Sequence, residues 1–113
     1  MKIAFTATGT GWDDKIDPRF GRTDFLLFYD EETKELTHYD NREITGVAHG
    51  AGPKTSQQLF EHSAQVLITG NGPGGNAAIA LKQMNLKVYV GAGGMSVRQA
   101  YQAYQEGKLP QGG

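Results

Sequence analysis

The sequence predicts an α/β domain with a five-stranded mixed sheet and three helices. The length of 113 residues suits one domain with its own hydrophobic core. Two short apolar segments early in the chain are joined by a polar turn, which is typical of a β-hairpin. Two strand–helix units follow, and helical crossovers are typical of parallel strands. The expected order of elements is β-β-β-α-β-α-β-α, and the expected strand order in the sheet is 3-2-1-4-5.

Three strands are predicted in the amino-terminal part of the chain. Residues Ile3–Thr8 form a short apolar segment that ends at Gly9, as expected of a buried strand. Phe25–Tyr29 and Leu36–Tyr39 flank the polar turn Asp30–Glu35, so they are expected to pair as a hairpin. In the predicted strand order Leu36–Tyr39 lies at the edge of the sheet. The polar residues between the first strand and the hairpin are expected to form a loop.

Helices and strands are expected to alternate in the second half. One helix is predicted from Pro53, which suits a first helical position, to Ala64. The strand Val66–Thr69 follows, and then a helix rich in alanine and leucine at Ala77–Met84. The last predicted strand is Val88–Val90. Each of these two strands is followed by a glycine-rich loop.

The last helix has the clearest signals. Ser96 and Gln99 form a capping-box pattern at its start, and Gly107 suits the position after its end. Its apolar face repeats with helical spacing and contains Val97, Ala100, Tyr101 and Tyr104. We expect residues 1–109 to form a single domain and residues 110–113 to be a tail, with fraying from Leu109 onward.

Composition excludes several classes of site. The chain has no cysteine, which rules out disulfides, thiolate-held zinc or iron–sulfur sites, and a cysteine nucleophile. A net charge of −1 argues against general nucleic-acid binding. The sequence shows neither a signal peptide nor a membrane-spanning segment, so a cytoplasmic location without membrane contact is expected.

Glycine-rich loops are the main candidates for ligand binding. The predicted sheet order brings the carboxyl ends of strands one, four and five to one edge, where open α/β sheets usually bind ligands. The segment Gly70–Gly75 matches G-x-G-x-x-G, but no acidic residue follows about 20 residues later, so a dinucleotide site is not indicated. Backbone amides in such loops suit an anion, although the glycines could equally serve tight turns. The absence of Asp and Glu between His62 and Gln105 suits an anion in the second half of the chain, and it is equally consistent with chance or with the needs of solubility.

A few side chains could extend such a site. Arg19 and Arg22 bracket Phe20 and predict a cationic rim, or alternatively a solvated loop with Phe20 in the core. His49 is the best candidate metal ligand, although a lone histidine is more often structural or exposed. Met95 suits either a sulfide contact or the core. The predicted binding residues are Arg19, Phe20, Arg22, His49, Gly70, Asn71, Gly72, Gly91, Gly93, Gly94 and Met95.

Catalysis is not predicted. The sheet order resembles the ribonuclease H architecture, whose nucleases need several metal-binding carboxylates near the centre of the sheet. The first and fourth predicted strands contain no acidic residue, so two-metal chemistry is not expected. The sequence also lacks a nucleophile elbow and an H-E-x-x-H motif. We therefore expect a binding protein and not an enzyme.

Five segments resemble the dinitrogenase iron–molybdenum cofactor biosynthesis family, which includes NifX, the core domain of NafY and the carboxyl-terminal domain of NifB. They cover most of the chain in the family's order and are Asp17–Phe25, Gly50–Gly52, Ile68–Gly72, Val88–Ala92 and Ala103–Leu109. The resemblance implies a ribonuclease H-like fold. It also implies non-covalent carriage of a metal–sulfur cluster or its precursor, of the molybdenum–iron or molybdenum–copper sulfide type.

One residue departs from the family's nitrogenase-associated members. Arg19 stands before Phe20-Gly21, where those members are expected to carry a histidine that contacts the cluster. The departure favours the small stand-alone relatives, including the orange-protein type, which holds a molybdenum–copper sulfide cluster by electrostatics. The resemblance also implies a cofactor-assembly protein or a MinD-type ATPase as partner. Two other interpretations remain open: a regulatory module that docks such an ATPase, and a small protein that binds a phosphorylated metabolite.

Overall fold

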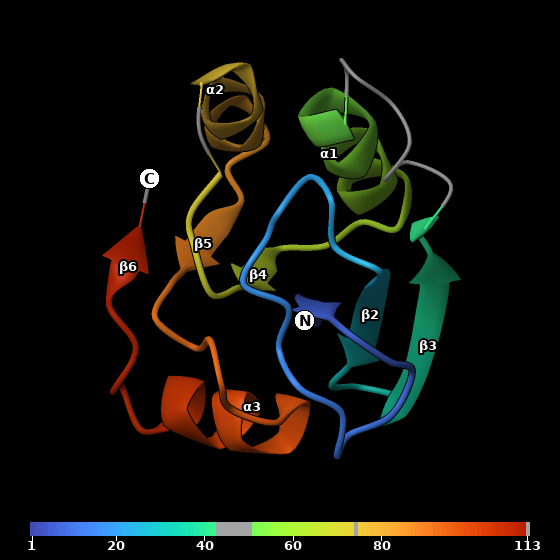
Figure 1. Ribbon diagram of the computed structural model, residues 1–113, viewed down its shortest axis with the longest axis vertical. Coiled ribbons are helices and arrows are strands. Elements are labelled where there is room, and N and C mark those ends of the chain that lie inside the picture. Colours follow the sequence, from blue (N-terminus) through green and yellow to red (C-terminus); the bar gives the residue numbers. More distant parts are fainter. Residues whose placement is uncertain (43–50, 74, 113) are drawn as a thin grey trace.

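The computed structural model describes residues 1–42, 51–73 and 75–112, which form a mixed sheet with helices on both faces (Figure 1). The elements are β1 Lys2–Ala7, β2 Phe25–Asp30, β3 Glu35–Asp40, α1 Ala51–Glu61, β4 Val66–Ile68, α2 Gly75–Gln83, β5 Lys87–Tyr89, α3 Val97–Gln105 and β6 Gln111–Gly112. Helices α1 and α2 lie on one face of the sheet and α3 on the other. No helix in these ranges is long and apolar enough to cross a membrane.

The strand order is β3-β2-β1-β4-β5-β6, which confirms the predicted order 3-2-1-4-5 and adds a sixth strand. Strand β1 pairs antiparallel with β2 and parallel with β4, and β4 pairs parallel with β5. The predicted hairpin is present, because β2 and β3 are antiparallel neighbours, and β3 is an edge of the sheet as expected.

The carboxyl-terminal residues differ from the expected frayed tail. Leu109 is buried in the core, and Val90 N donates to Pro110 O at 2.9 Å. Gln111–Gly112 then pairs antiparallel with β5. Gly107, with a φ of 72°, lets the chain turn back after α3. The strand Gln111–Gly112 is too short to have a periodic pattern that would predict it from the sequence.

Alternation along the strands divides the core into two clusters. Ile3 and Phe5 of β1 face α3, which contributes Val97 and Ala100 to the same cluster. The neighbouring strand residues point the other way, as the pleat of a strand requires, and pack against α1 and α2. That second cluster contains Ala4, Phe20, Leu26, Phe28, Leu59, Leu67, Leu81, Leu86 and Val88.

The start of α3 confirms the predicted capping box. Gln99 N donates to Ser96 Oγ at 3.1 Å, and Ser96 N donates to Gln99 Oε1 at 2.9 Å. These two bonds satisfy two amides that the helix itself cannot pair. The cap therefore fixes where α3 begins, directly after the loop that leaves β5.

Candidate functional site

Loops that follow β1, β4 and β5 meet at one edge of the sheet, as the strand order predicts. Asn71 N donates to Pro18 O at 2.8 Å, which ties the loop after β4 to the loop after β1. Gly91 N donates to Gly70 O at 2.9 Å, which ties the loop after β5 to the loop after β4. The loop after β3, with His49, lies outside the described residues.

Gly70 is where the three loops come closest. A Cβ at this position would lie 2.6 Å from Pro18 Cα and 3.3 Å from Gly93 Cα. Real Cβ atoms do not approach backbone atoms as closely as the first of these distances, so only glycine fits without movement of the chain. The close packing of three backbones therefore holds the site together.

Two threonine hydroxyls lie beneath the loops. Thr6 and Thr69 follow the paired residues Phe5 and Ile68 of β1 and β4, and their hydroxyl oxygens are 2.8 Å apart. Thr6 Oγ1 also contacts Asp17 O at 2.8 Å, and Asp17 N donates to Thr6 O at 2.9 Å. These contacts anchor the loop after β1 to the sheet.

The glycine loops leave several backbone donors unused. Within residues 1–42, 51–73 and 75–112, no hydrogen-bond acceptor is found for the N–H groups of four glycines: Gly70, Gly72, Gly93 and Gly94. Gly91 and Gly94 have φ values of 86° and 87°, in the left-handed region that favours glycine. Unpaired amides in turns of this kind form concave sites for anions.

Arg19 is held by carboxylates. Its Nε and Nη2 donate to the two oxygens of Asp17 at 3.0 and 2.9 Å, and Nη2 lies 3.5 Å from Asp24 Oδ1. The side chain of Arg19 is 51% exposed, whereas that of Asp17 is 1% exposed. The positive charge predicted for a rim is therefore balanced locally, and Arg19 Nη1 has no partner in the described part of the chain.

Asp17 organises the loop after β1. Besides Arg19 Nε and Nη2, its carboxylate accepts from Arg19 N at 2.9 Å and from Asp24 N at 3.2 Å. Burial raises the pKa of Asp17, but the hydrogen bonds from Arg19 and Asp24 and the charge of Arg19 outweigh it, so the net pKa is lowered. The carboxylate is therefore ionised at neutral pH.

The remaining predicted binding residues differ in burial and in the part of the structure that they contact. Phe20 is 6% exposed and lies in the cluster under α1 and α2, as its alternative interpretation predicted. Met95 is half-buried and packs against the cluster under α3. Asn71 is exposed on the site loops, and Arg22 is half-buried and has an interaction partner. In the described residues, no group of three histidine, cysteine or acidic side chains could hold a metal ion.

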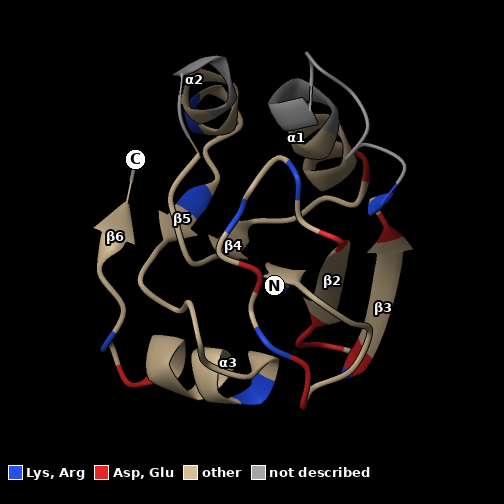
Figure 2. Ribbon diagram, viewed as in Figure 1, with Lys and Arg blue, Asp and Glu red and all other residues tan. Residues whose placement is uncertain are grey.

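Sequence reasoning did not identify Asp17, Thr6 or Thr69 as site residues. The signal for the threonines was available, since Thr6 is a polar residue inside the otherwise apolar strand β1 and Thr69 directly follows the apolar strand β4. Figure 2 shows a charge asymmetry that the sequence did predict: acidic residues gather around the β2–β3 hairpin, whereas β4, α2 and β5 carry none.

Comparisons with known proteins find relatives in sequence and in fold. Residues 1–107 match the family model described as dinitrogenase iron-molybdenum cofactor. The apo form of the orange protein from Desulfovibrio gigas is 38% identical, with 98% of this chain and 92% of that chain covered and a TM-score of 0.91. A protein from Thermotoga, described as a candidate NifB protein, is 33% identical, with 97% and 91% covered and a TM-score of 0.83. No curated protein matches the sequence.

Proposed function

The chain belongs to the dinitrogenase iron-molybdenum cofactor family, and from that premise we propose that it binds and carries an anionic metal–sulfur cluster or a precursor of one. The family handles metal clusters in cofactor biosynthesis, as carriers and not as catalysts. The cluster is cargo, held without covalent ligands from cysteine, because the chain contains none. The molybdenum–copper or molybdenum–iron sulfide type is the cargo we favour.

The observation that carries this proposal is the set of unpaired glycine amides. Three N–H groups at exposed glycines of two adjoining loops, Gly72, Gly93 and Gly94, lack an acceptor among the described residues, and the loops are tied at the buried Gly70. Bridging and terminal sulfides of a cluster accept hydrogen bonds from such amides, as anions do at other backbone nests. Gly72, Gly93 and Gly94 are exposed and have no side chain, so a bulky cluster can approach their backbone closely, whereas Gly70 is buried against Pro18.

Arg19 contributes an oriented hydrogen-bond donor, Nη1. It adds little net charge to the site, because the carboxylate of Asp17 balances its guanidinium. Asp17 fixes the guanidinium through two hydrogen bonds, so Nη1 is presented without loss of side-chain freedom when an anion binds. The same carboxylate reduces the long-range attraction of the site for anions. Binding therefore depends on short contacts, and we expect added salt to weaken it only moderately.

The test is a titration of the metal-free protein with tetrathiomolybdate, a small sulfide-rich anion, followed by visible absorption. We expect saturable binding at low salt, and about tenfold weaker binding by the variant Arg19→Ala/Arg22→Ala, the size expected for two half-exposed charged hydrogen bonds. Arg98→Ala is the matched control, because Arg98 is also exposed and paired with a carboxylate, Asp13. Molybdate, which has oxygens in place of sulfides, serves as the second ligand.

Equal affinity of the double variant and Arg98→Ala for tetrathiomolybdate at low salt would contradict the role given to the arginines. The absence of saturable binding to wild type would contradict the site itself. Equal binding of molybdate and tetrathiomolybdate would leave an anion site but remove the preference for sulfide.

A further inference from the structure

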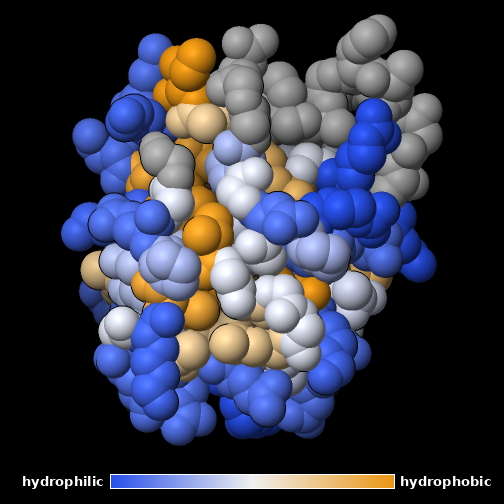
Figure 3. Space-filling view, turned by 60° about the vertical axis from the view of Figure 1, so that its left-hand side comes forward, coloured by the Kyte–Doolittle hydropathy of each residue, from blue (hydrophilic) through white to orange (hydrophobic). Residues whose placement is uncertain are grey.

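A pocket lies between α2 and the β5–β6 edge of the sheet, separated from Gly72 of the glycine loops by the side chain of Val90. Its volume is about 320 Å³, within the range of small-molecule sites, and its lining residues are Ala78, Leu81, Lys82, Leu86, Val88, Gln111 and Gly112. Figure 3 turns this side of the molecule forward and shows apolar surface between hydrophilic side chains.

The floor of the pocket is aliphatic. Leu81, Leu86 and Val88 are 1%, 6% and 5% exposed, so they present little surface to water and are held by the core beneath α2. An apolar floor of this kind binds a hydrocarbon group and gives little to a small inorganic ion.

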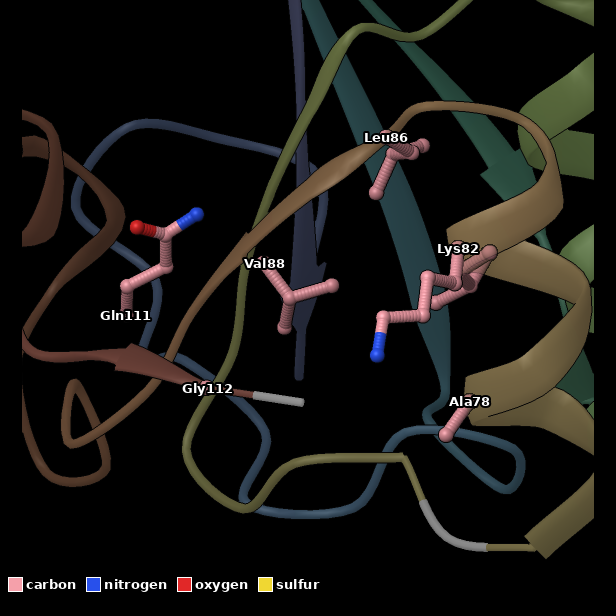
Figure 4. Close-up of a pocket in the computed structure, with 7 residues that line it drawn as sticks. Ala78, Lys82, Leu86, Val88, Gln111 and Gly112 are labelled. Atoms are coloured by element: carbon pink, nitrogen blue, oxygen red, sulfur yellow. The ribbon is translucent and has the colours of Figure 1, made fainter.

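Among the described residues, Lys82 is the only charged one that lines the pocket. Figure 4 shows its side chain extending from α2 over the space beside Val88, with Gln111 and Gly112 on the other side. Lys82 has no hydrogen-bond or ion-pair partner in residues 1–42, 51–73 and 75–112. Since residues 62–105 contain no acidic side chain, nothing in that stretch of the chain competes for this ammonium group.

We propose that this pocket binds a small monocarboxylate with a short aliphatic body. The ammonium of Lys82 pairs with the carboxylate, while the hydrocarbon lies on Leu81, Leu86 and Val88. A single lysine suits a monoanion, whereas a phosphate group is usually held by several donors. An amphipathic ligand uses both the charge and the apolar floor, which neither an inorganic anion nor a neutral hydrocarbon does.

The pocket is separate from the cluster site. Val90 lies between the two, because a Cβ at Gly112 would be 2.6 Å from Val90 Cγ1 and a Cβ at Gly72 would be 3.4 Å from the same atom. None of the pocket residues is among the glycines with unpaired amides. The proposal therefore does not depend on cluster binding and can be tested on metal-free protein.

The test is a titration of the metal-free protein with hexanoate, followed by the backbone amide NMR shifts of Val88, Lys82 and Gly112. We expect one saturable site with a Kd on the order of millimolar, as befits so small a ligand. Lys82→Gln should bind hexanoate about fivefold more weakly, the size expected for one exposed charge pair, and Lys82→Arg should retain most of the affinity. Lys87→Gln is the matched control, because Lys87 is next to Val88 on β5 and points to the opposite face.

Two further probes separate the parts of the proposal. Hexanol lacks the charge and acetate lacks the hydrocarbon, so both should bind more weakly than hexanoate. Equal binding of hexanol and hexanoate, together with unchanged affinity of Lys82→Gln, would overturn the proposal in favour of a plain apolar cleft. Shifts that are scattered over the surface, or that do not saturate, would also overturn it.

Discussion

Replacing Asp17 by asparagine should destabilise the protein much more than the same change at Asp40. The two residues make the same local arrangement, since each accepts from the N, Nε and Nη2 of the arginine two positions later. They differ in burial: the side chain of Asp17 is 1% exposed and that of Asp40 is 47% exposed. A comparison of Asp17→Asn with Asp40→Asn therefore measures how burial of the carboxylate affects stability, with the spacing to the arginine held constant.

The expected magnitude follows from the four donors that face Asp17. Asparagine has one acceptor oxygen, so at most two of these donors keep a partner, and its NH2 group faces the remaining N–H groups. Losing two hydrogen bonds to a buried charged acceptor, partly offset by hydration of exposed Arg19, should cost about 3 kcal/mol. For a domain of this size the melting temperature should fall by roughly 10–20 °C. Asp40→Asn should change stability little, because water replaces the lost contacts.

Thermal and urea unfolding of both variants at neutral pH measure this difference, and a pH series adds an independent check. The pKa of Asp17 is lowered in the folded state, so its contribution is complete above the unfolded pKa of about 3.9 and is lost as pH falls through the lower folded value. The gap in stability between wild type and Asp17→Asn should therefore shrink as the pH falls below about 4. Equal losses for Asp17→Asn and Asp40→Asn would show that burial of the Asp17 carboxylate does not add to stability.

Three other outcomes are expected. Gly70→Ala should lower the free energy of unfolding by about 2–3 kcal/mol, because the new Cβ would lie 2.6 Å from a backbone atom. Gly93→Ala should change it by no more than about 0.5 kcal/mol, because the nearest atom to its Cβ would be 3.7 Å away. Similar melting curves for the two variants would mean that the loops do not meet at Gly70. Leu109→Ala should cost about 2–4 kcal/mol in urea unfolding, and a near-neutral result would restore the frayed tail. His49→Gln should change the dependence of cluster retention on pH near about 6.5, measured by visible absorption, and identical curves for variant and wild type would exclude His49 from the site.

Local patterns were enough to predict most of the fold. The hairpin β2–β3 and the two later strand–helix units each have a short-range signal, and they predict the strand order once β1 is taken to lie beside β4 and parallel to it. Strand β6 has no such signal, because its pairing with β5 depends on where α3 directs the chain and on the burial of Leu109. Contacts of this kind are set by tertiary packing and not by local sequence.

The candidate site was predicted less completely for a similar reason. The glycine loops could be placed at one edge because their positions follow from the strand order. The pairing of Arg19 with a buried carboxylate could not be predicted from the sequence. Asp17-Pro18-Arg19 and Asp40-Asn41-Arg42 have the same spacing, but only the first carboxylate is buried. Burial depends on the loop being anchored to Thr6, a contact between segments that the sequence does not relate.

We propose that this chain carries an anionic metal–sulfur cluster in its glycine loops. The most direct measurement is purification of the protein from its native source without added metal, followed by elemental analysis for molybdenum, copper, iron and sulfide and by visible absorption. We expect metal and inorganic sulfide in fixed proportion to the chain, with charge-transfer absorption that disappears when the cluster is released. Protein that is colourless and free of metal and sulfide after gentle purification at low salt would contradict it.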